Sequence, residues 1–244
     1  MKPVLPLIKK HCLSNPNIEM CGFVVCSKLD YIVIPARNIS PNPEHYFEID
    51  SLEYIKAKYK GRIEAIYHSH IVDCPISFYD KYNAEQLCCD YIMYCLPTDK
   101  FELYHYCGKT YSYLGRRFEM GKFDCLTLVI DFYKEELGIQ LNNYFSERGA
   151  DFFLKERSIM KEAKYLDLIK KEGFKILDAA TPLKVNDVLF CFNDSNSSFP
   201  SHFAVYLGNN RILQQLNNYP STITELDKNA KDKILYVLRH KNYE

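Results

Sequence analysis

The chain has 244 residues, a formal net charge of zero and 47% hydrophobic residues. This length suits one large or two small domains, and the hydrophobic content is sufficient for two modest cores. A charge balance with neither a basic excess nor an acidic tail argues against binding to nucleic acid.

Cysteine usage and the N-terminus favour a chain without disulfides. We expect no secretory leader, because the apolar part of the first ten residues is short and interrupted by two prolines. Most of the thiols should therefore be buried and unpaired. The sequence contains no CxxC pair, so we do not expect a structural zinc ribbon. No apolar run approaches the roughly 20 residues of a membrane span. The ten cysteines are Cys12, Cys21, Cys26, Cys74, Cys88, Cys89, Cys95, Cys107, Cys125 and Cys191.

In the first half, helical and strand patterns alternate. Leu52, Ile55 and Tyr59 fall on one side of a predicted helix, and a turn is expected near Leu29 and Asp30. The predicted helices cover residues 1–13, 51–60 and 77–89. The predicted strands cover residues 19–27, 31–35 and 62–70, with one or two more within 91–106 and a loop over 38–44.

The pattern restarts near residue 107, where we place a boundary between domains 1–107 and 108–244. Residues 124–137 form the clearest helix, with Asp124 as N-cap and Gly138 just beyond its end. Its apolar stripe consists of Leu126, Val129, Ile130, Tyr133 and Leu137. Residues 145–172 are expected to be mixed or helical. The predicted strands cover residues 187–192, 202–207, 211–216 and 235–239, with a hairpin turn over 208–210.

A cysteine at the start of that helix suggests nucleophilic chemistry. Cys125 would occupy the first turn, where the unpaired amides and the helix dipole stabilise a thiolate and can hold an oxyanion. His202 is the only histidine between residues 106 and 239, so it is the candidate base. Across the hairpin, Gln214 is best placed to orient the imidazole, and Gln215 faces the opposite side. The alternative is a buried cysteine and a surface histidine without a joint role.

Three segments support the catalytic interpretation. LGRRFEMGKFDCLTLVIDFYKEELGIQLNNY, VNDVLFCF and SHFAVYLGNNRILQQL, which begin at residues 114, 185 and 201, resemble NlpC-type cell-wall cysteine peptidases, above all their phage tail version. The resemblance implies a papain-like α+β domain that cleaves peptidoglycan stem peptides. It assigns Cys125 as nucleophile, His202 as base and Gln214 as the orienting residue. Relatives usually carry His at that third position, and many carry Tyr where Phe118 stands.

A second group of polar residues lies in the first half. His68 and His70 are two positions apart on a predicted strand, so both point to one face and could bind zinc. Asp80 could be a third ligand with Ser77 in support, and Glu19 could take a proton from metal-bound water. Alternatively, Ser77 and Asp80 form a helix capping box and the histidines lie on a polar sheet edge.

The first half also resembles a JAMM-type metallopeptidase domain. The segments are IEMCGFVV, HYFEID and AIYHSHIVDCPISFYD, which begin at residues 18, 45 and 65. The family pattern is Glu, His-x-His, seven residues, Ser, two residues and Asp. Only six residues separate His70 from Ser77 here, and Ile71 replaces the usual Pro. The resemblance implies a mixed sheet flanked by helices and a zinc ion held by His68, His70 and Asp80.

The order of the two domains resembles that of tail-tip assembly proteins of long-tailed phages. The expected fold class is α+β, a JAMM-like α/β domain followed by an NlpC-type α+β domain. The resemblance implies a virion tail-tip peptidase, made in the host cytoplasm and acting at the host wall, with peptidoglycan stem peptides and other tail-tip proteins as partners. The alternatives are a metal-dependent isopeptidase or processing protease, and a non-catalytic tail assembly module with relic sites.

Overall fold

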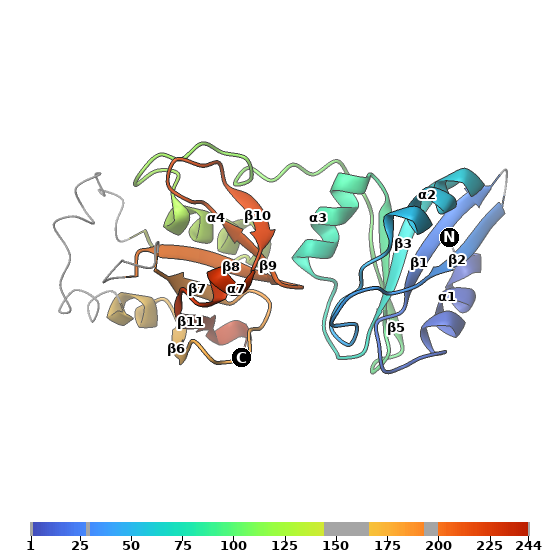
Figure 1. Cartoon of the computed structure of the whole chain (residues 1–244), viewed down its shortest axis with the longest axis horizontal. Coiled ribbons are helices and arrows are strands. Elements are labelled where there is room, and N and C mark those ends of the chain that lie inside the picture. The colour runs from blue at the N-terminus through green and yellow to red at the C-terminus, as the bar shows by residue number, and fades with distance from the viewer. Residues whose placement is uncertain (1, 28–29, 144–165, 193–199, 244) are drawn as a thin grey trace. The chain divides into compact units, whose positions relative to one another are not determined.

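The computed structural model describes residues 2–27, 30–143, 166–192 and 200–243. The chain divides into two compact units, Met1–Thr110 and Tyr111–Glu244, called unit 1 and unit 2 below (Figure 1). Each has its own sheet and its own core. The protein is therefore a mixed α+β chain made of two compact units.

Unit 1 is built on a mixed sheet with the strand order β2-β1-β3-β4-β5. Its strands are β1 (Cys21–Ser27), β2 (Asp30–Ala36), β3 (Arg62–His70), β4 (Asp90–Cys95) and β5 (Lys100–Tyr104). Its helices are η1 (Lys2–Val4), α1 (Leu5–Cys12), α2 (Ser51–Lys60) and α3 (Phe78–Leu87). Strands β3 and β4 are parallel and the other neighbours antiparallel. Helix α3 makes the crossover that a parallel pair requires.

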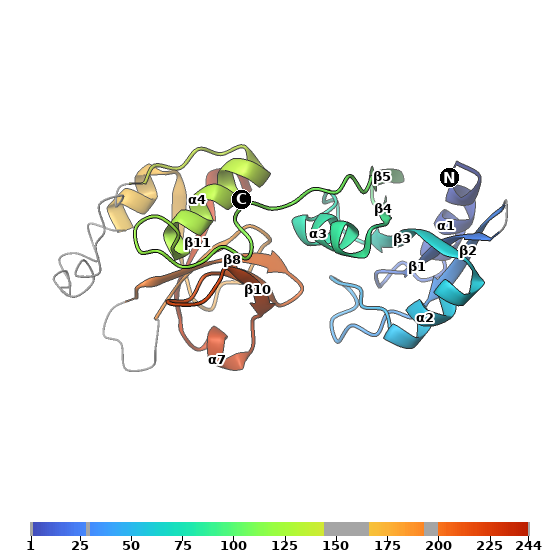
Figure 2. The same cartoon turned by 90° about the horizontal axis from the view of Figure 1, so that it is seen from above.

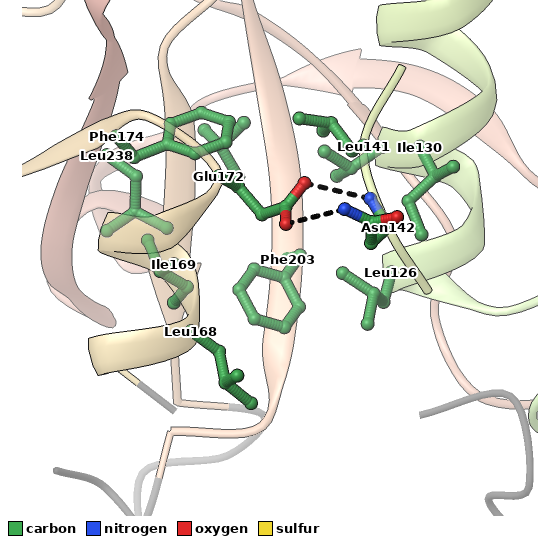
Figure 3. Close-up of a pocket in the computed structure, with 12 residues that line it drawn as sticks. Leu126, Ile130, Leu141, Asn142, Leu168, Ile169, Glu172, Phe174, Phe203 and Leu238 are labelled. Carbon is green, nitrogen blue, oxygen red and sulfur yellow. Dashed lines mark hydrogen bonds between the residues drawn. The ribbon is translucent and has the colours of Figure 1, made fainter. Parts of the chain in front are cut away.

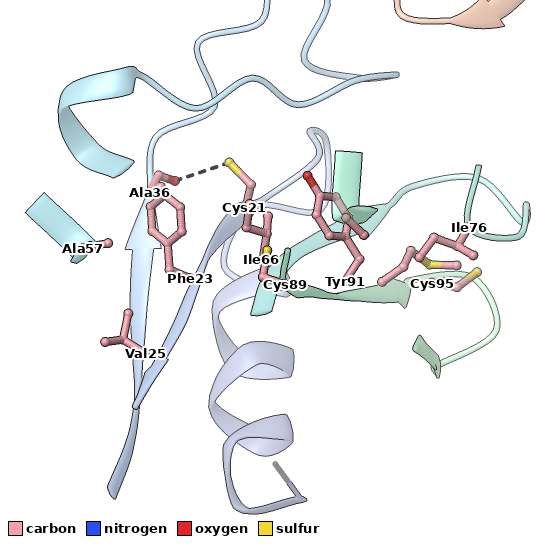
Figure 4. Packing of buried hydrophobic residues seen from close by; sticks show 12 residues of the cluster. Cys21, Phe23, Val25, Ala36, Ala57, Ile66, Ile76, Cys89, Tyr91 and Cys95 are labelled. Atoms are coloured by element: carbon pink, nitrogen blue, oxygen red, sulfur yellow. Dashed lines mark hydrogen bonds between the residues drawn. The ribbon is translucent and has the colours of Figure 1, made fainter. Parts of the chain in front are cut away.

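The two faces of this sheet carry different helices. Side chains alternate along β3, so Tyr67 packs with residues of α1, whereas Ile66 belongs to the core that includes residues of α2 and α3. Figure 4 shows Ile66 in this second core. His68, two residues after Ile66, points to the same face of the sheet as Ile66. Its ring stacks on Phe47, which packs against that second core. The alternation of the strand therefore directs the histidines of β3 towards the face that α3 covers.

The helices and strands predicted for this half are present within a few residues of their predicted bounds. Leu52, Ile55 and Tyr59 do share one side of α2, but that side is exposed. Ala57 is buried instead, because a small side chain lets the helix lie close to the sheet. The predicted turn at Leu29 lies outside the described residues.

Unit 2 contains an antiparallel sheet with the strand order β10-β9-β8-β7-β11-β6. Its strands are β6 (Phe174–Asp178), β7 (Val188–Cys191), β8 (His202–Gly208), β9 (Arg211–Gln214), β10 (Thr222–Glu225) and β11 (Ile234–His240). Its helical elements are α4 (Cys125–Leu137), residues 166–171, α7 (Lys228–Lys231) and η2 (Lys241–Tyr243). The sequence did not predict β6, β10 or α7. Most of the segment 145–172 lies outside the described residues.

Helix α4 starts and ends where the sequence predicts. The Asp124 side chain accepts hydrogen bonds from the amides of Leu126 and Thr127, and Gly138 ends the helix in the left-handed conformation. The helix packs on β8 (Figure 2). Leu128 and Phe132 are buried as well as most of the predicted stripe, so the buried face is wider than the sequence indicated.

The hairpin between β8 and β9 fixes the register of unit 2's central strands. Asn209 and Asn210 both have positive φ, 48° and 51°, as a tight two-residue turn requires. Ala204 then pairs with Gln214. Gln214 consequently lies diagonally across from His202, two residues before Ala204 on the same face of the sheet.

In the described part of the chain, no helix combines the length and apolar character needed to cross a bilayer. The ten cysteines, all among the described residues, form no disulfide. Five are buried, half of them rather than the expected majority, whereas Cys88 and Cys107 are exposed.

Candidate functional sites

The thiol of Cys125 lies beside the first residue of β8. Cys125 is the first residue of α4 and is half-buried. Its Sγ is 3.9 Å from the carbonyl oxygen of Ser201, which immediately precedes His202. The fold therefore brings the sulfur from the middle of the chain to the strand that begins with the imidazole.

His202 is held by a chain of two hydrogen bonds. Its Nε2 lies 3.0 Å from Gln214 Oε1, and Gln214 Nε2 donates to Thr224 Oγ1 at 2.8 Å. An amide oxygen only accepts, so Nε2 of the imidazole carries the hydrogen and Nδ1 keeps its lone pair. The sequence predicted Gln214 but not Thr224, because Thr224 lies on a strand, β10, that the sequence pattern did not reveal.

Burial favours the neutral form of this imidazole. His202 is buried, and its pKa is lowered first because burial disfavours the charged ring. The hydrogen bond that His202 donates to Gln214 raises the pKa, and the positive charge of Lys233 adds to the lowering. A neutral imidazole with a free lone pair is the form that a general base needs.

The first turn of α4 differs from the predicted oxyanion site. Asp124 Oδ1 accepts from the amides of Leu126 and Thr127 at 3.1 and 3.0 Å. These two donors serve the cap, so an oxyanion needs donors other than them. The sequence identified Asp124 as the cap, but the same residue occupies amides that the thiol site was expected to use.

A second thiol lies close to the site. Cys191 on β7 is the direct cross-strand partner of His202. Burial, together with the charge of Cys125, raises the pKa of Cys191 to about 12, so Cys191 stays a neutral thiol. Gln215 is buried and faces away from Gln214 towards Arg116, as the alternation of a strand predicts. Phe118 is half-buried.

An apolar cavity of about 60 Å³ lies between α4, the helical residues 166–171 and the sheet (Figure 3). Glu172 accepts hydrogen bonds there from the backbone amide and the side chain of Asn142, at 2.8 and 3.0 Å. Phe203 lines the cavity, whereas Cys125 and His202 do not. The cavity is therefore separate from the thiol site.

In unit 1, β3 and α3 bring three possible metal ligands together. His68 Nε2 and His70 Nε2 are 3.0 Å apart, and Asp80 Oδ2 is 3.7 Å from His68 Nε2. One ligand atom from each residue lies within 4.8 Å of the others, and all three residues are buried. The loop after His70, one residue shorter than in the resembling family, still brings Asp80 to the histidines.

Ser77 and Asp80 form a capping box as well. Asp80 Oδ2 accepts from the amide and hydroxyl of Ser77 at 2.9 and 2.6 Å, and the Ser77 hydroxyl accepts from the Asp80 amide. The two interpretations of this pair are thus compatible, because one carboxylate caps α3 and faces His68. Glu19 is buried with Oε1 4.0 Å from His70 Nε2. Burial, with repulsion by Asp80, raises the pKa of Glu19 well above its usual range.

The outer nitrogens of the two histidines have different surroundings. His70 Nδ1 lies 3.2 Å from the carbonyl oxygen of Cys74 and 3.0 Å from its Sγ. His68 Nδ1 is buried without a hydrogen-bond partner. Burial lowers the pKa of His68 to about 4, which keeps the ring neutral. Two imidazoles and a carboxyl group converging at these distances fit the donor set of a tetrahedral zinc site.

Comparison with known proteins gives a family match and two relatives, one of which is aligned over nearly its whole length. The NlpC/P60 family model matches residues 103–239. Tail tip assembly protein K of Escherichia phage N15 is 24% identical over 236 residues, which cover 96% of this chain and 93% of the relative. Tail tip assembly protein K of Escherichia phage lambda is 30% identical over 168 residues, which cover 67% of this chain and 75% of the relative.

Proposed function

The chain belongs to the NlpC/P60 family, a family of cysteine peptidases, and on this premise we propose that unit 2 hydrolyses peptide bonds in the stem peptides of peptidoglycan. The hydrogen-bonded series from His202 through Gln214 to Thr224 is the observation that carries the proposal. These hydrogen bonds leave Nδ1 of a neutral imidazole unprotonated. The Cys125 sulfur lies at the start of the same strand, β8.

The proposed reaction proceeds through a thioester. The Cys125 thiol gives its proton to His202 Nδ1 while the sulfur attacks the scissile carbonyl carbon. The C–N bond then breaks, and the imidazolium protonates the leaving amine. Water attacks the thioester carbonyl, His202 takes a proton from that water, and the C–S bond breaks. The imidazolium finally returns its proton to the Cys125 sulfur, so the enzyme is regenerated.

The relatives suggest where this activity is used. Both relatives are tail tip assembly proteins, and the relative from phage N15 aligns with 96% of this chain. We therefore infer that the chain is a component of a phage tail tip, with other tail proteins as partners. Stem-peptide cleavage at that position would open the host wall during DNA entry.

The first test uses the full chain on purified peptidoglycan. Wild type should release stem-peptide fragments, measured by mass spectrometry. Cys125→Ala should lose at least about 1,000-fold in rate, because removal of a nucleophile leaves only the contribution of binding and electrostatics. Cys88→Ser, which alters an exposed thiol of unit 1, should retain the wild-type rate. Equal fragment release by wild type and Cys125→Ala would exclude the thiol mechanism.

We also propose that unit 1 is a JAMM-like metallopeptidase domain that holds zinc through His68, His70 and Asp80. The convergence of these three buried groups, with Glu19 beside His70, supports the proposal. A zinc ion bound there would acidify a bound water. Glu19, in its deprotonated form, would take the proton that this water releases, since its carboxylate lies beside His70. Such a site would serve a processing protease or an isopeptidase.

Metal content tests this second proposal directly. The chain purified from zinc-supplemented cells should contain about one zinc ion per molecule by elemental analysis, and His68→Ala/His70→Ala should contain none. His105→Ala, an exposed histidine paired with Asp90, is the matched control and should keep the zinc. A folded wild-type protein that binds no zinc would make unit 1 a scaffold with a relic site.

A further inference from the structure

Arg116 lies in a segment of unit 2 without regular secondary structure, and the proposed reaction does not use it. Its side chain is only 11% exposed, although arginine is rarely buried without a specific arrangement of partners. Nη1 donates to Asp131 Oδ2, Nη2 donates to Thr127 Oγ1 at 3.2 Å, and Nε donates to Gln215 Oε1 at 3.4 Å. The guanidinium carbon is 5.1 Å from the centre of the Phe123 ring. Each edge of the guanidinium therefore has a defined neighbour.

One side of this arrangement is the first turn of α4. Thr127 Oγ1 also accepts from the Asp124 amide at 2.8 Å and donates to the Asp124 carbonyl at 3.0 Å. Thr127 is thus part of the capping box that fixes the turn in which Cys125 is the first residue. Asp131 lies one turn further along the helix. The guanidinium therefore contacts the cap and the second turn of the nucleophile's helix together.

The other side is the segment that leaves β9. Gln215 is 1% exposed, and its Nε2 donates to the carbonyl oxygen of Arg116 at 3.1 Å. Its neighbour Gln214 points the opposite way and binds His202. The Ser221 hydroxyl, between β9 and β10, accepts from the Arg116 amide at 3.1 Å, and the Ser221 amide donates to the Arg116 carbonyl at the same distance. Backbone and side chain of Arg116 are therefore both hydrogen-bonded to the segment that connects β9, which carries Gln214, to β10, which carries Thr224.

We propose that Arg116 is a positioning residue that holds the Cys125 helix in register with the strands that orient His202. The inference rests on the proposed thiol peptidase. One planar group with five N–H donors joins the two parts of the site, one from α4 and one from the β9–β10 segment. A lysine ammonium cannot replace it, because it lacks the planar fork that reaches three acceptors in fixed directions. A displacement of about 1 Å between nucleophile and base can cost about 100-fold in rate.

The test compares Arg116→Lys and Arg116→Ala with wild type. Their kcat for stem-peptide release should fall by about 10- to 100-fold while KM changes little, because the interaction positions the reacting groups rather than the substrate. The rate at which iodoacetamide alkylates Cys125, located by mass spectrometry, should fall in parallel. Guanidinium ion at low millimolar concentration should restore part of both rates in Arg116→Ala, since it can occupy the vacated position.

Arg239→Ala is the matched control. It removes another largely buried arginine of unit 2, whose NH2 group donates to Asp187 Oδ2 at 2.7 Å and to the Pro182 carbonyl oxygen at 2.9 Å. It should lower the melting temperature, yet keep the wild-type kcat per folded molecule and show no response to guanidinium. If Arg116→Ala does not fold, Gln215→Ala serves instead, with a smaller fall of about 3- to 10-fold in kcat.

Wild-type rates in both Arg116 variants, or an absence of guanidinium rescue in folded Arg116→Ala, would overturn the positioning role. A wild-type chain that releases no stem peptides would refute the proposed function. The alkylation rates would then still decide the inference: an unchanged Cys125 rate in the folded Arg116 variants counts against it, and a fall of 10-fold or more that guanidinium reverses supports it.

Discussion

Gln214 illustrates how a single residue can orient a base without sharing its proton. Its oxygen accepts from His202 and its nitrogen donates to Thr224, so the amide holds the imidazole in one orientation. An amide does not titrate, so it takes no proton from the imidazole. The sequence predicted this contact from the hairpin alone. It could not predict Thr224, whose strand of four residues has no distinctive hydrophobic pattern. It also could not predict that Cys74 lies against His70, because that contact depends on the fold of a loop without regular structure.

The lowered pKa of His202 predicts a specific pH dependence. The neutral base persists as pH falls, so the acid limb of kcat/KM should have its midpoint below the ordinary histidine value of 6.5. The Gln214 bond raises this pKa, so Gln214→Met should move the midpoint further down while it lowers the maximal rate. Initial rates of stem-peptide release from pH 4.5 to 8 measure both effects. A midpoint above 6.5, or an upward movement in Gln214→Met, would contradict the assignment of His202 as base.

At the scale of elements, the sequence predicted α4 well because its signals are local. Asp124, the apolar spacing and Gly138 each act within a few residues of themselves. The exposed side of α2 was not evident from the same kind of reasoning, because burial of Ala57 depends on how closely the helix approaches the sheet. Likewise β6 and β10 are strands because they pair with β11 and β9. Strand β11 lies more than 50 residues after β6, and β10 has only four residues and no distinctive hydrophobic pattern of its own.

Asp124, the N-cap of α4, has two expected effects. Its hydrogen bonds stabilise the helix, and its negative charge opposes formation of the Cys125 thiolate. Asp124→Ala should destabilise unit 2 by about 0.5–2 kcal/mol, because the amides of Leu126 and Thr127 lose their acceptor. Asp124→Asn should keep most of that stability. It also removes a negative charge from the residue that precedes Cys125, so the alkylation rate of Cys125 near neutral pH should rise about threefold. Thermal unfolding and iodoacetamide kinetics measure the two effects; slower alkylation in a stable Asp124→Asn protein would show that the charge does not oppose the thiolate.

At the scale of the whole molecule, the sequence analysis expected two domains with a boundary after residue 107, and the structure separates two units after Thr110. The intervening residues are attached to unit 1 by the buried carboxylate of Glu85. Its oxygens accept from the amides of Cys107 and Lys109 at 3.2 and 2.9 Å and from the Tyr104 hydroxyl at 2.7 Å. No local pattern marks this attachment, because it joins α3 to a segment more than 20 residues later.

Separate cores predict that the two units fold independently. Fragments 1–110 and 111–244 should each unfold cooperatively in urea, followed by circular dichroism. A fragment that ends at residue 106 lacks the Cys107 and Lys109 amides and leaves Glu85 with fewer donors. It should therefore be less stable than fragment 1–110 by about 1–3 kcal/mol. Equal stability of fragments 1–106 and 1–110 would show that the Glu85 contacts contribute little, and an unfolded 1–110 fragment would contradict independent folding.

The separation of the hydrophobic cores of unit 1 from that of unit 2 also bears on how such a chain can evolve. Val24 and Tyr67 stabilise one half, Leu189 and Val237 the other, and neither set shares a residue with its counterpart. A mutation that abolishes chemistry in one half leaves the fold of the other untouched, so selection acts on each separately. A lineage that lost the proposed activity of one unit would still inherit the fold of the other.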